Sequence, residues 1–262
     1  MTVLRSALYQ IAFLAWTLVL GILYLPVLMS PRPVALVAAR IWIHGTLAMV
    51  RIILGIRWEI RGRDNLPPGP VVIAAKHQSA WDTLIFHALV PDPAYVLKKE
   101  LLILPVVGWF LWKTDMVAID RKAGIKALKF MAEHAKLALA NRRQVIIFPE
   151  GTRTAVGAAL PYHSGVAMLY GLGVPVVPVA LNSGLLWPRD AFLRRAGKVI
   201  LEILPAMPEG LDRKAFVREL QARIEGATAR LVAEGTGADF SSSVDKSVDS
   251  AGRAGAGTGD NT

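Results

Sequence analysis

The longest apolar run in the chain lies near its start and predicts a membrane helix. Residues 7–29 are almost unbroken in apolar character, interrupted by Gln10 and Thr17. As an α-helix this run would be about 34 Å long, which is enough to cross a bilayer core. A signal peptide is the competing interpretation. The run is long for a signal-peptide core, however, and no small-residue cleavage site follows it closely.

Residues 30–33, Ser-Pro-Arg-Pro, end the first helix and lead into a second apolar segment at 34–56. On a helical wheel Arg40, His44 and Arg51 fall within about 40° of one another, which predicts an amphipathic helix suited to lie in the membrane interface. Arg32 at the turn opposes full translocation. We therefore predict a helical hairpin embedded from the cytoplasmic side. Two ordinary core helices packed on a globular domain are the alternative.

Beyond the hairpin, short apolar runs alternate with amphipathic stretches, as is typical of an α/β fold. We predict that the sheet is mixed and flanked by helices. Prolines within the run at 174–181 favour an edge strand or a bulge there. The predicted strands cover 57–61, 71–75, 94–97, 116–119, 144–148, 174–181 and 198–204, and the predicted helices begin near Ser79 or cover 126–142, 164–170 and 212–233.

This pattern divides the chain into three parts. Residues 1–56 are the predicted membrane-anchoring hairpin, and residues 57–234 are the predicted catalytic domain. Residues 235–262 consist mainly of Gly, Ser, Ala and Asp with few large apolar side chains, so we predict a disordered tail.

Composition narrows the choice of partner. Hydrophobic residues make up 53% of the chain, and the net charge is +10, so an anionic partner is expected. High hydrophobicity together with basicity favours a membrane surface over nucleic acid, for which we find no motif. The chain has no cysteine, which excludes disulfides, thiolate metal sites and a cysteine nucleophile.

The stretch His77-Gln78-Ser79-Ala80-Trp81-Asp82 follows a buried strand and leads into a helix. On one continuous helix His77 and Asp82 would lie about 140° apart and could not pair. If the helix starts near Ser79, Asp82 can reach back and orient the imidazole, which would act as a base. Ser79 and Asp82 also form a capping-box pattern, so a purely structural role is the alternative.

Two further strands end in polar clusters, Asp120-Arg121 and Glu150-Gly151-Thr152-Arg153. Ligands of open α/β sheets bind beyond the carboxyl ends of the strands, so these clusters and the His77 turn are expected to converge there. The chain lacks G-x-S-x-G and H-E-x-x-H, which counts against an α/β-hydrolase or a zinc hydrolase.

Four motifs, in this order, resemble the glycerolipid acyltransferases, and among them the bacterial 1-acyl-glycerol-3-phosphate acyltransferases. The resemblance covers about residues 57–205. The motifs are residues 77–82, Ile119-Asp120-Arg121, the run 148–153 (Phe-Pro-Glu-Gly-Thr-Arg) and the run 174–181.

The resemblance implies transfer of an acyl group from acyl-CoA or acyl carrier protein to lysophosphatidic acid, giving phosphatidic acid. It also implies a cytoplasmic-membrane protein whose catalytic domain lies on the cytoplasmic side. A thioester donor is already activated, so no metal, cofactor or covalent enzyme intermediate is expected. The oxyanion stabiliser is not readable from the sequence, and backbone amides at the start of the Ser79 helix are one candidate.

The resemblance also assigns residue roles. His77 would be the general base and Asp82 would orient it. Lys98, Arg121 and Arg153 would hold the phosphate, since the planar guanidinium of Arg binds phosphate oxygens in pairs. The remaining expected site residues, which would hold the glycerol side of the acceptor or the loop itself, are Glu150, Gly151 and Thr152.

Two positions depart from the family pattern: Lys76 stands where many relatives carry Asn, and Ala118 where an aromatic residue is common. Histidines outside the motifs are expected to be structural or at the surface, namely His44, His87, His134 and His163. Two rival functions stay open at this point. One is acylation of another lysolipid, such as lyso-ornithine lipid. The other is a membrane-surface protein that binds anionic lipid without turnover.

Overall fold

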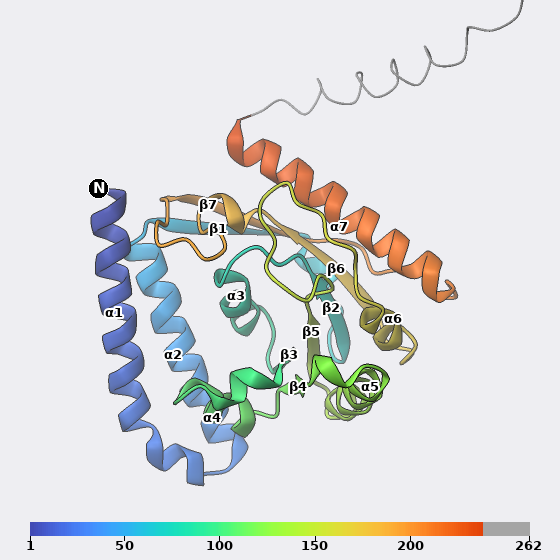
Figure 1. Ribbon diagram of the computed structural model, residues 1–262, viewed down its shortest axis with the longest axis horizontal. Helices are drawn as coiled ribbons and strands as arrows, with labels where there is room; N and C mark the ends of the chain where they lie inside the picture. Colours follow the sequence, from blue (N-terminus) through green and yellow to red (C-terminus); the bar gives the residue numbers. More distant parts are fainter. Residues whose placement is uncertain (238–262) are drawn as a thin grey trace, which may run out of the picture.

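In the computed structural model, which describes residues 1–237, a seven-stranded sheet lies at the centre of the molecule (Figure 1). Its order is β1-β7-β6-β2-β5-β3-β4, and all neighbours are parallel except β6 and β7. The predicted mixed sheet flanked by helices is therefore confirmed. The strands are β1 (Ile56–Arg61), β2 (Val71–Ala75), β3 (Pro93–Lys98), β4 (Val117–Ile119), β5 (Gln144–Ile147), β6 (Val176–Leu181) and β7 (Gly197–Ile203).

The helices cover both faces of this sheet, and short 3-10 turns connect several elements. Helices are needed on both faces because successive side chains of a strand point to opposite faces, and those of β2 enter two separate hydrophobic cores. Val71 and Ile73 pack toward α2 and α3, whereas Val72 and Ala74 pack toward α5, α6 and α7. The helices are α1 (Thr2–Leu23), α2 (Arg32–Ile52), α3 (Trp81–Leu89), α4 (Val107–Lys113), α5 (Ile125–Ala140), α6 (Gly165–Tyr170) and α7 (Arg213–Thr236).

Helices α1 and α2 form the N-terminal hairpin at one side of the molecule (Figure 1). The indole N–H of Trp16 donates to the Trp42 carbonyl, and that of Trp42 donates to the Thr17 hydroxyl, each at 3.0 Å. The inner side of α2 joins the core through Ile43 and Leu47. Both helices are long and apolar enough to cross a membrane. The hairpin therefore packs on the domain, as the alternative interpretation of two core helices predicts. It also leaves an apolar outer face exposed.

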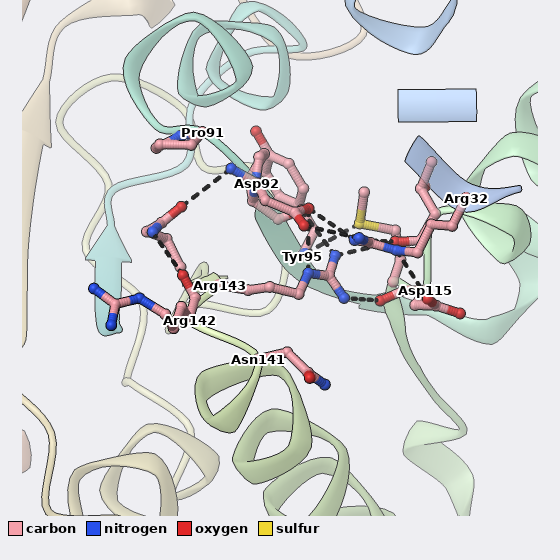
Figure 2. A network of polar contacts seen from close by, with 12 residues as sticks. Arg32, Pro91, Asp92, Tyr95, Asp115, Asn141, Arg142 and Arg143 are labelled. Atoms are coloured by element: carbon pink, nitrogen blue, oxygen red, sulfur yellow. Dashed lines mark hydrogen bonds and ion pairs between the residues drawn. The ribbon is translucent and has the colours of Figure 1, made fainter. Parts of the chain in front are cut away.

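A network of arginines and aspartates ties the turn of the hairpin to the amino-terminal edge of the sheet (Figure 2). Arg32 Nη2 lies 2.8 Å from Asp92 Oδ1, and Arg32 Nε lies 2.9 Å from Asp115 Oδ2. Arg143 Nε approaches the same Asp92 oxygen at 3.2 Å. Because Asp92 directly precedes β3, these contacts fix the hairpin at the sheet edge opposite to the predicted site.

Strand β6 corrects the prediction of an edge strand or a bulge, because it lies inside the sheet between β2 and β7. The reason is the direction in which Pro178 faces. Its carbonyl faces β7 and accepts from the Leu204 N–H at 2.9 Å, and Leu204 is the first residue after β7. The nitrogen of Pro178, which has no hydrogen, therefore faces a residue beyond the end of the β6–β7 ladder. The alternate residues Pro175 and Val179 accept from β2 and the residue after it, which leaves the β2 pairing intact.

Several other boundaries differ from the sequence-based expectations by a few residues, among them the ends of three helices. The first helix ends at Leu23 and continues as a 3-10 turn, η1 (Leu25–Met29), since Pro26 cannot continue the helical ladder. The second helix stops at Ile52, because Gly55 turns the chain at φ 71° into β1. The last helix, α7, runs on to Thr236. The rest of the predicted tail, residues 238–262, lies outside the described residues.

The segment between β3 and β4 was not assigned from the sequence. It folds into a 3-10 turn, η3 (Lys99–Ile103), followed by α4. Gly108 is required there, because a Cβ on it would lie 2.2 Å from the Leu102 carbonyl oxygen. The segment packs beside η1 and α2, and its side chains form one wall of the cleft at the carboxyl-terminal edge of the sheet.

Candidate active site

The turn between β2 and α3 presents His77 at the carboxyl-terminal edge of the sheet. Both backbone groups of His77 are held by the loop after β5. Its N–H donates to Glu150 Oε2 at 2.8 Å, and its carbonyl accepts from the Thr154 N–H at 2.8 Å. The ring stacks on Phe148 with centroids 4.0 Å apart. Backbone and ring are therefore fixed before any substrate binds.

The predicted contact between His77 and Asp82 is present. Nδ1 of His77 lies 3.0 Å from Asp82 Oδ2, and α3 begins at Trp81, so His77 is outside the helix and Asp82 is in its first turn. Because Asp82 occupies Nδ1, the tautomer with the proton on Nδ1 is favoured, and Nε2 is the ring nitrogen left to accept a proton. His77 keeps some exposure, whereas Asp82 is fully buried.

Asp82 also performs the structural role that the capping pattern suggested. Its Oδ2 accepts from the backbone N–H groups of Gln78 at 2.7 Å and Ser79 at 2.8 Å. The Ser79 hydroxyl accepts in turn from the Trp81 N–H at 2.9 Å. These amides are therefore engaged within the turn. The expectation that amides at the start of this helix stabilise an oxyanion is wrong for Gln78, Ser79 and Trp81.

Ser183 is a site residue that the sequence analysis missed. It lies in η5 (Ser183–Leu185), directly after β6, and its hydroxyl donates to Asp82 Oδ1 at 2.6 Å. The neighbouring Gly184 N–H donates to the Gln78 side chain at 3.1 Å. The rule that found the other clusters would have found this one, since Asn182-Ser183-Gly184 is a polar run that directly follows a buried strand.

A cleft of about 490 Å³ opens above His77, a volume within the range of known ligand sites. It brings together five of the predicted substrate-binding residues with His77. They come from the ends of β3 and β4 and from the loop after β5. These residues are Lys98, Arg121, Gly151, Thr152 and Arg153.

The opposite side of the cleft is apolar. Its walls come from α2, α3 and the η3–α4 segment, through Ile43, Leu84, Leu104 and Leu111 among others. A second cavity, almost entirely apolar, continues from this side between the hairpin and α4 and shares Trp42 with the cleft. The site thus combines a cationic rim with an apolar recess.

His87 lies in the wall shared by the cleft and the apolar cavity. The sequence-based expectation was that it lies outside the motifs as a structural or surface residue. Its ring lies 5.2 Å from that of Tyr95, and burial, reinforced by the charge of Arg40, lowers its pKa to about 4. His87 is therefore neutral at physiological pH and contributes an aromatic wall rather than a charge.

The loop after β5 turns at Gly151, whose φ of 69° disfavours a residue with a side chain. A Cβ there would also lie 2.8 Å from the His163 ring. The Arg121 guanidinium donates to the Gly151 carbonyl, which links the loop after β4 to the loop after β5. Partial burial lowers the pKa of Arg121. Because the ordinary pKa of arginine is far above neutral pH, the side chain stays a cation at the cleft.

Arg153 projects from the same loop and lines the cleft. Its Nη2 lies 2.9 Å from Asp190 Oδ1, and Arg189 donates to the Arg153 carbonyl at 2.9 Å. Both partners of the Arg153–Asp190 pair are exposed, so the pair is expected to contribute only about 0–1 kcal/mol to stability. Nη2 is the only guanidinium nitrogen of Arg153 paired with a carboxylate among residues 1–237.

Glu150 occupies a different position from its neighbours in the motif. Its side chain is fully buried and does not line the cleft. Oε2 accepts from the His77 N–H, and Oε1 accepts from the Thr154 hydroxyl at 2.8 Å. Burial raises the pKa of Glu150, and contact with the Lys76 ammonium opposes that rise. Of the two expected roles, the geometry favours holding the loop over contact with the glycerol side.

Among residues 1–237 no group of three or more potential acidic, histidine or cysteine ligands is placed to hold a metal ion. The polar side chains that line the cleft are two imidazoles, a lysine, three guanidiniums, two threonines, a tyrosine and one carboxylate, Asp190, which pairs with Arg153 and Arg189 and leaves the cationic groups in excess. This set suits proton transfer together with the binding of an anion.

Comparisons with known proteins agree with this arrangement. A family model described as Acyltransferase matches residues 57–182, which include every predicted site residue. A solved structure titled as the 1-acyl-sn-glycerophosphate (LPA) acyltransferase, PlsC, from Thermotoga maritima has the same fold. It aligns with a TM-score of 0.70 at 23% identity and covers 88% of this chain and 99% of that chain.

Two relatives found by sequence have a higher identity to this chain than the solved structure has. The chain is 36% identical over 194 residues to a 1-acyl-sn-glycerol-3-phosphate acyltransferase of Pseudomonas aeruginosa, covering 74% of this chain and 76% of the relative. It is 31% identical over 212 residues to the Escherichia coli protein of the same name, covering 79% and 84%. At this identity and coverage, the chain belongs to the family of 1-acyl-sn-glycerol-3-phosphate acyltransferases.

Proposed function

We propose that the protein transfers a fatty acyl group from a thioester donor to the free hydroxyl of 1-acyl-glycerol-3-phosphate, giving phosphatidic acid. The observation that carries this proposal is the His77–Asp82 pair at a cleft with a cationic rim and an apolar recess. The relatives named above carry this activity in their names. Acyl-CoA and acyl carrier protein are both suitable donors.

In the proposed mechanism, Nε2 of His77 removes the proton from the acceptor hydroxyl. The alkoxide oxygen attacks the thioester carbonyl carbon, and the new C–O bond forms as the carbonyl becomes an oxyanion. Collapse of this intermediate breaks the C–S bond, and the thiolate takes the proton from the imidazolium. Asp82 holds the ring and stabilises its charged form throughout. Every step balances without a metal, a cofactor or a covalent enzyme intermediate.

The cationic rim is proposed to bind the acceptor phosphate. Lys98 at the end of β3, Arg121 after β4 and Arg153 after β5 line the cleft, and each supplies donors to a dianionic group. Gly151, whose carbonyl accepts from Arg121, and Thr152 also line the cleft and would contact the glycerol part of the acceptor. The apolar cavity beside Trp42 and Leu111 has a volume of about 100 Å³ and would take part of a fatty acyl chain that enters from the cleft.

The proposed location is the cytoplasmic membrane, with the catalytic domain on its cytoplasmic side. Two apolar helices with an exposed outer face support membrane association. The net charge of +10 suits an anionic leaflet, and Arg32 at the hairpin turn disfavours translocation of that turn.

The test is release of free thiol from acyl-CoA by the purified, full-length protein in mixed micelles. We expect release only when lysophosphatidic acid is present, with phosphatidic acid as the product. Greater release with lyso-ornithine lipid would assign the rival acceptor. Binding of lysolipid with no thiol release from acyl-CoA or acyl carrier protein would favour the non-catalytic lipid-binding function.

Exchange of Arg153 for lysine is expected to weaken use of the phosphorylated acceptor more than use of the acyl donor. Lysine keeps the charge but loses the planar, paired donors. A hydrogen bond to a charged group is worth about 1.5–3 kcal/mol, so we expect kcat/KM for lysophosphatidic acid to fall roughly ten- to hundredfold. Initial rates with each substrate varied in turn measure the effect.

Asp190→Asn is the matched control, since it breaks the Arg153–Asp190 ion pair and leaves the guanidinium in place. Because that pair is exposed, both variants should melt close to the wild type. Equal losses for donor and acceptor, together with a lower melting temperature in both variants, would assign Arg153 to the loop structure alone.

A further inference from the structure

Lys76 is a buried cation directly beside the residue proposed as the general base. Its side chain is 1% exposed, and lysine is almost never buried to this degree without partners. Nζ lies 2.6 Å from Glu150 Oε1 and 2.8 and 2.9 Å from the two oxygens of Glu225 on α7. A contact of 3.3 Å to the Ala158 carbonyl completes its surroundings. The three ammonium protons thus face three acceptor groups.

These contacts form a chain from α7 to the His77 backbone. Glu150 accepts from Lys76 through one oxygen and from the His77 N–H through the other. The Thr154 hydroxyl also donates to Glu150, while the Thr154 N–H donates to the His77 carbonyl. Lys76 therefore contacts Glu150, which holds the His77 N–H directly and also accepts from Thr154, the residue that holds the His77 carbonyl.

The charges indicate what the ammonium does. Glu150 and Glu225 supply two carboxylates to one ammonium, and the Tyr162 hydroxyl donates to Glu225 at 2.9 Å. Glu225 keeps some contact with solvent, whereas Glu150 has none. Burial raises the pKa of Glu150, and Lys76 is the largest opposing influence, ahead of the His77 N–H and the Thr154 hydroxyl, so Lys76 is the main group that favours the carboxylate. A neutral carboxyl accepts a weaker hydrogen bond from the His77 N–H than a carboxylate does.

We propose that Lys76 is a positioning residue, which keeps Glu150 ionised so that Glu150 holds the His77 turn, with Glu225 as the second counter-charge on α7. The inference rests on the proposed function, because its readout is acyl transfer. Lys76 does not line the cleft and touches no reacting atom in this arrangement. Its contribution is to the geometry and the pH range in which His77 works.

Lys76→Met tests this directly, because methionine keeps the length and removes the charge. We expect kcat at neutral pH to fall about ten- to hundredfold with little change in KM for either substrate, since small errors in positioning have costs of this size. The loss should depend on pH. Without the ammonium the pKa of Glu150 rises further, so the ratio of variant to wild-type kcat should be lowest at acid pH and recover as pH rises.

Two further variants separate positioning from stability. Lys76→Met combined with Glu225→Gln removes the unpaired second carboxylate while leaving an acceptor for the Tyr162 hydroxyl. We expect this double variant to regain melting temperature and to keep the pH-dependent loss of kcat. Lys76→Met combined with Glu150→Gln leaves no titratable side chain at position 150, so the ratio of its kcat to that of Glu150→Gln alone should not change with pH.

Lys198→Met is the matched control, because Lys198 also pairs with a carboxylate, Glu59, but at the exposed end of β7. It should behave as wild type. A loss of kcat in Lys76→Met that is equal at every pH, or that disappears in the Glu225→Gln double variant as stability returns, would overturn the positioning role. A Lys76→Met variant whose kcat equals that of the wild type at every pH would also overturn the positioning role. Absence of thiol release by the wild type would instead contradict the proposed function.

Discussion

Replacement of His77 by alanine is expected to reduce acyl transfer by about 10²–10⁴-fold, the usual contribution of a general base. The fold should survive, because the backbone N–H that donates to Glu150 is still present in alanine. Asp82 also keeps donors after the change, from the Gln78 and Ser79 amides and from the Ser183 hydroxyl. Asp82 is therefore not left as an unpaired buried charge, and the variant isolates the chemistry of the imidazole.

The measurement is thiol release from acyl-CoA in the presence of lysophosphatidic acid, beside a thermal melt and a vesicle-binding assay. His134→Ala is the control, since His134 is exposed on α5 and contacts the Phe130 ring and carbonyl in the same helix. It should retain full activity. Near-normal turnover in His77→Ala would remove the imidazole from the mechanism.

Asp82→Asn would be a poorer probe of the same chemistry. Asp82 Oδ2 accepts from two backbone amides and lies against His77 Nδ1, so an amide nitrogen placed there would face other donors. The alternative orientation would place it against the Ser183 hydroxyl. In the first orientation buried donors face one another, and in the second the Ser183 hydroxyl can accept from the amide but loses the acceptor for its own proton. A buried donor left unsatisfied costs about 1–3 kcal/mol, so stability and catalysis would change together.

The contact between His77 and Asp82 was predictable because it is local. A buried strand, a short turn and a helix start set the distance between two residues five positions apart, whatever the rest of the fold does. The convergence of Lys98, Arg121 and the loop after β5 was predictable for a related reason. Parallel strands end at one edge, so their following residues gather there.

The support of the site was not predictable in the same way, because it depends on strand order and on helix placement. Ser183 reaches Asp82 only because β6 lies next to β2 in the sheet. Glu225 reaches Lys76 only because α7 crosses the sheet near the end of β2 (Figure 1). Nothing in the local pattern around either residue sets these distances.

Side-chain direction was the other unpredictable property. The motif at 148–153 indicates a loop at the site, but the sequence does not tell which members face the ligand. Thr152 and Arg153 line the cleft, whereas Glu150 points inward to Lys76 and the His77 N–H. Pro178 likewise suggested an edge strand, because the direction of its missing N–H depends on where β7 ends.

Exchange of four apolar residues on the outer stripe of α1 for glutamine is expected to release the protein from vesicles while leaving its fold intact. Burial of a leucine or isoleucine side chain is worth about 1.5–3 kcal/mol, so four together are worth roughly 6–12 kcal/mol of membrane affinity. On an ideal helix they lie within an arc of about 80°. The residues are Leu4, Leu8, Ile11 and Leu18, all exposed in the structure.

This variant is sharper than deletion of residues 1–56. Deletion would also remove Ile43, Leu47 and Val50, which are buried in the main core, so loss of fold and loss of anchoring would coincide. Glutamine is a good helix former, and the stripe faces away from the core, so the melting temperature should change little.

Flotation with anionic vesicles and protease protection measure the result, and we expect partition into vesicles to fall at least about 1,000-fold, which corresponds to roughly 4 kcal/mol. Ile125→Gln with Leu137→Gln on α5 is the matched control, because both residues are exposed and apolar but lie on the other side of the molecule (Figure 1). The control should float as wild type does. If the α1 variant floats equally well, the outer stripe of α1 does not enter the membrane. The alternative interpretation would then hold, in which the two helices of the hairpin only pack on the domain.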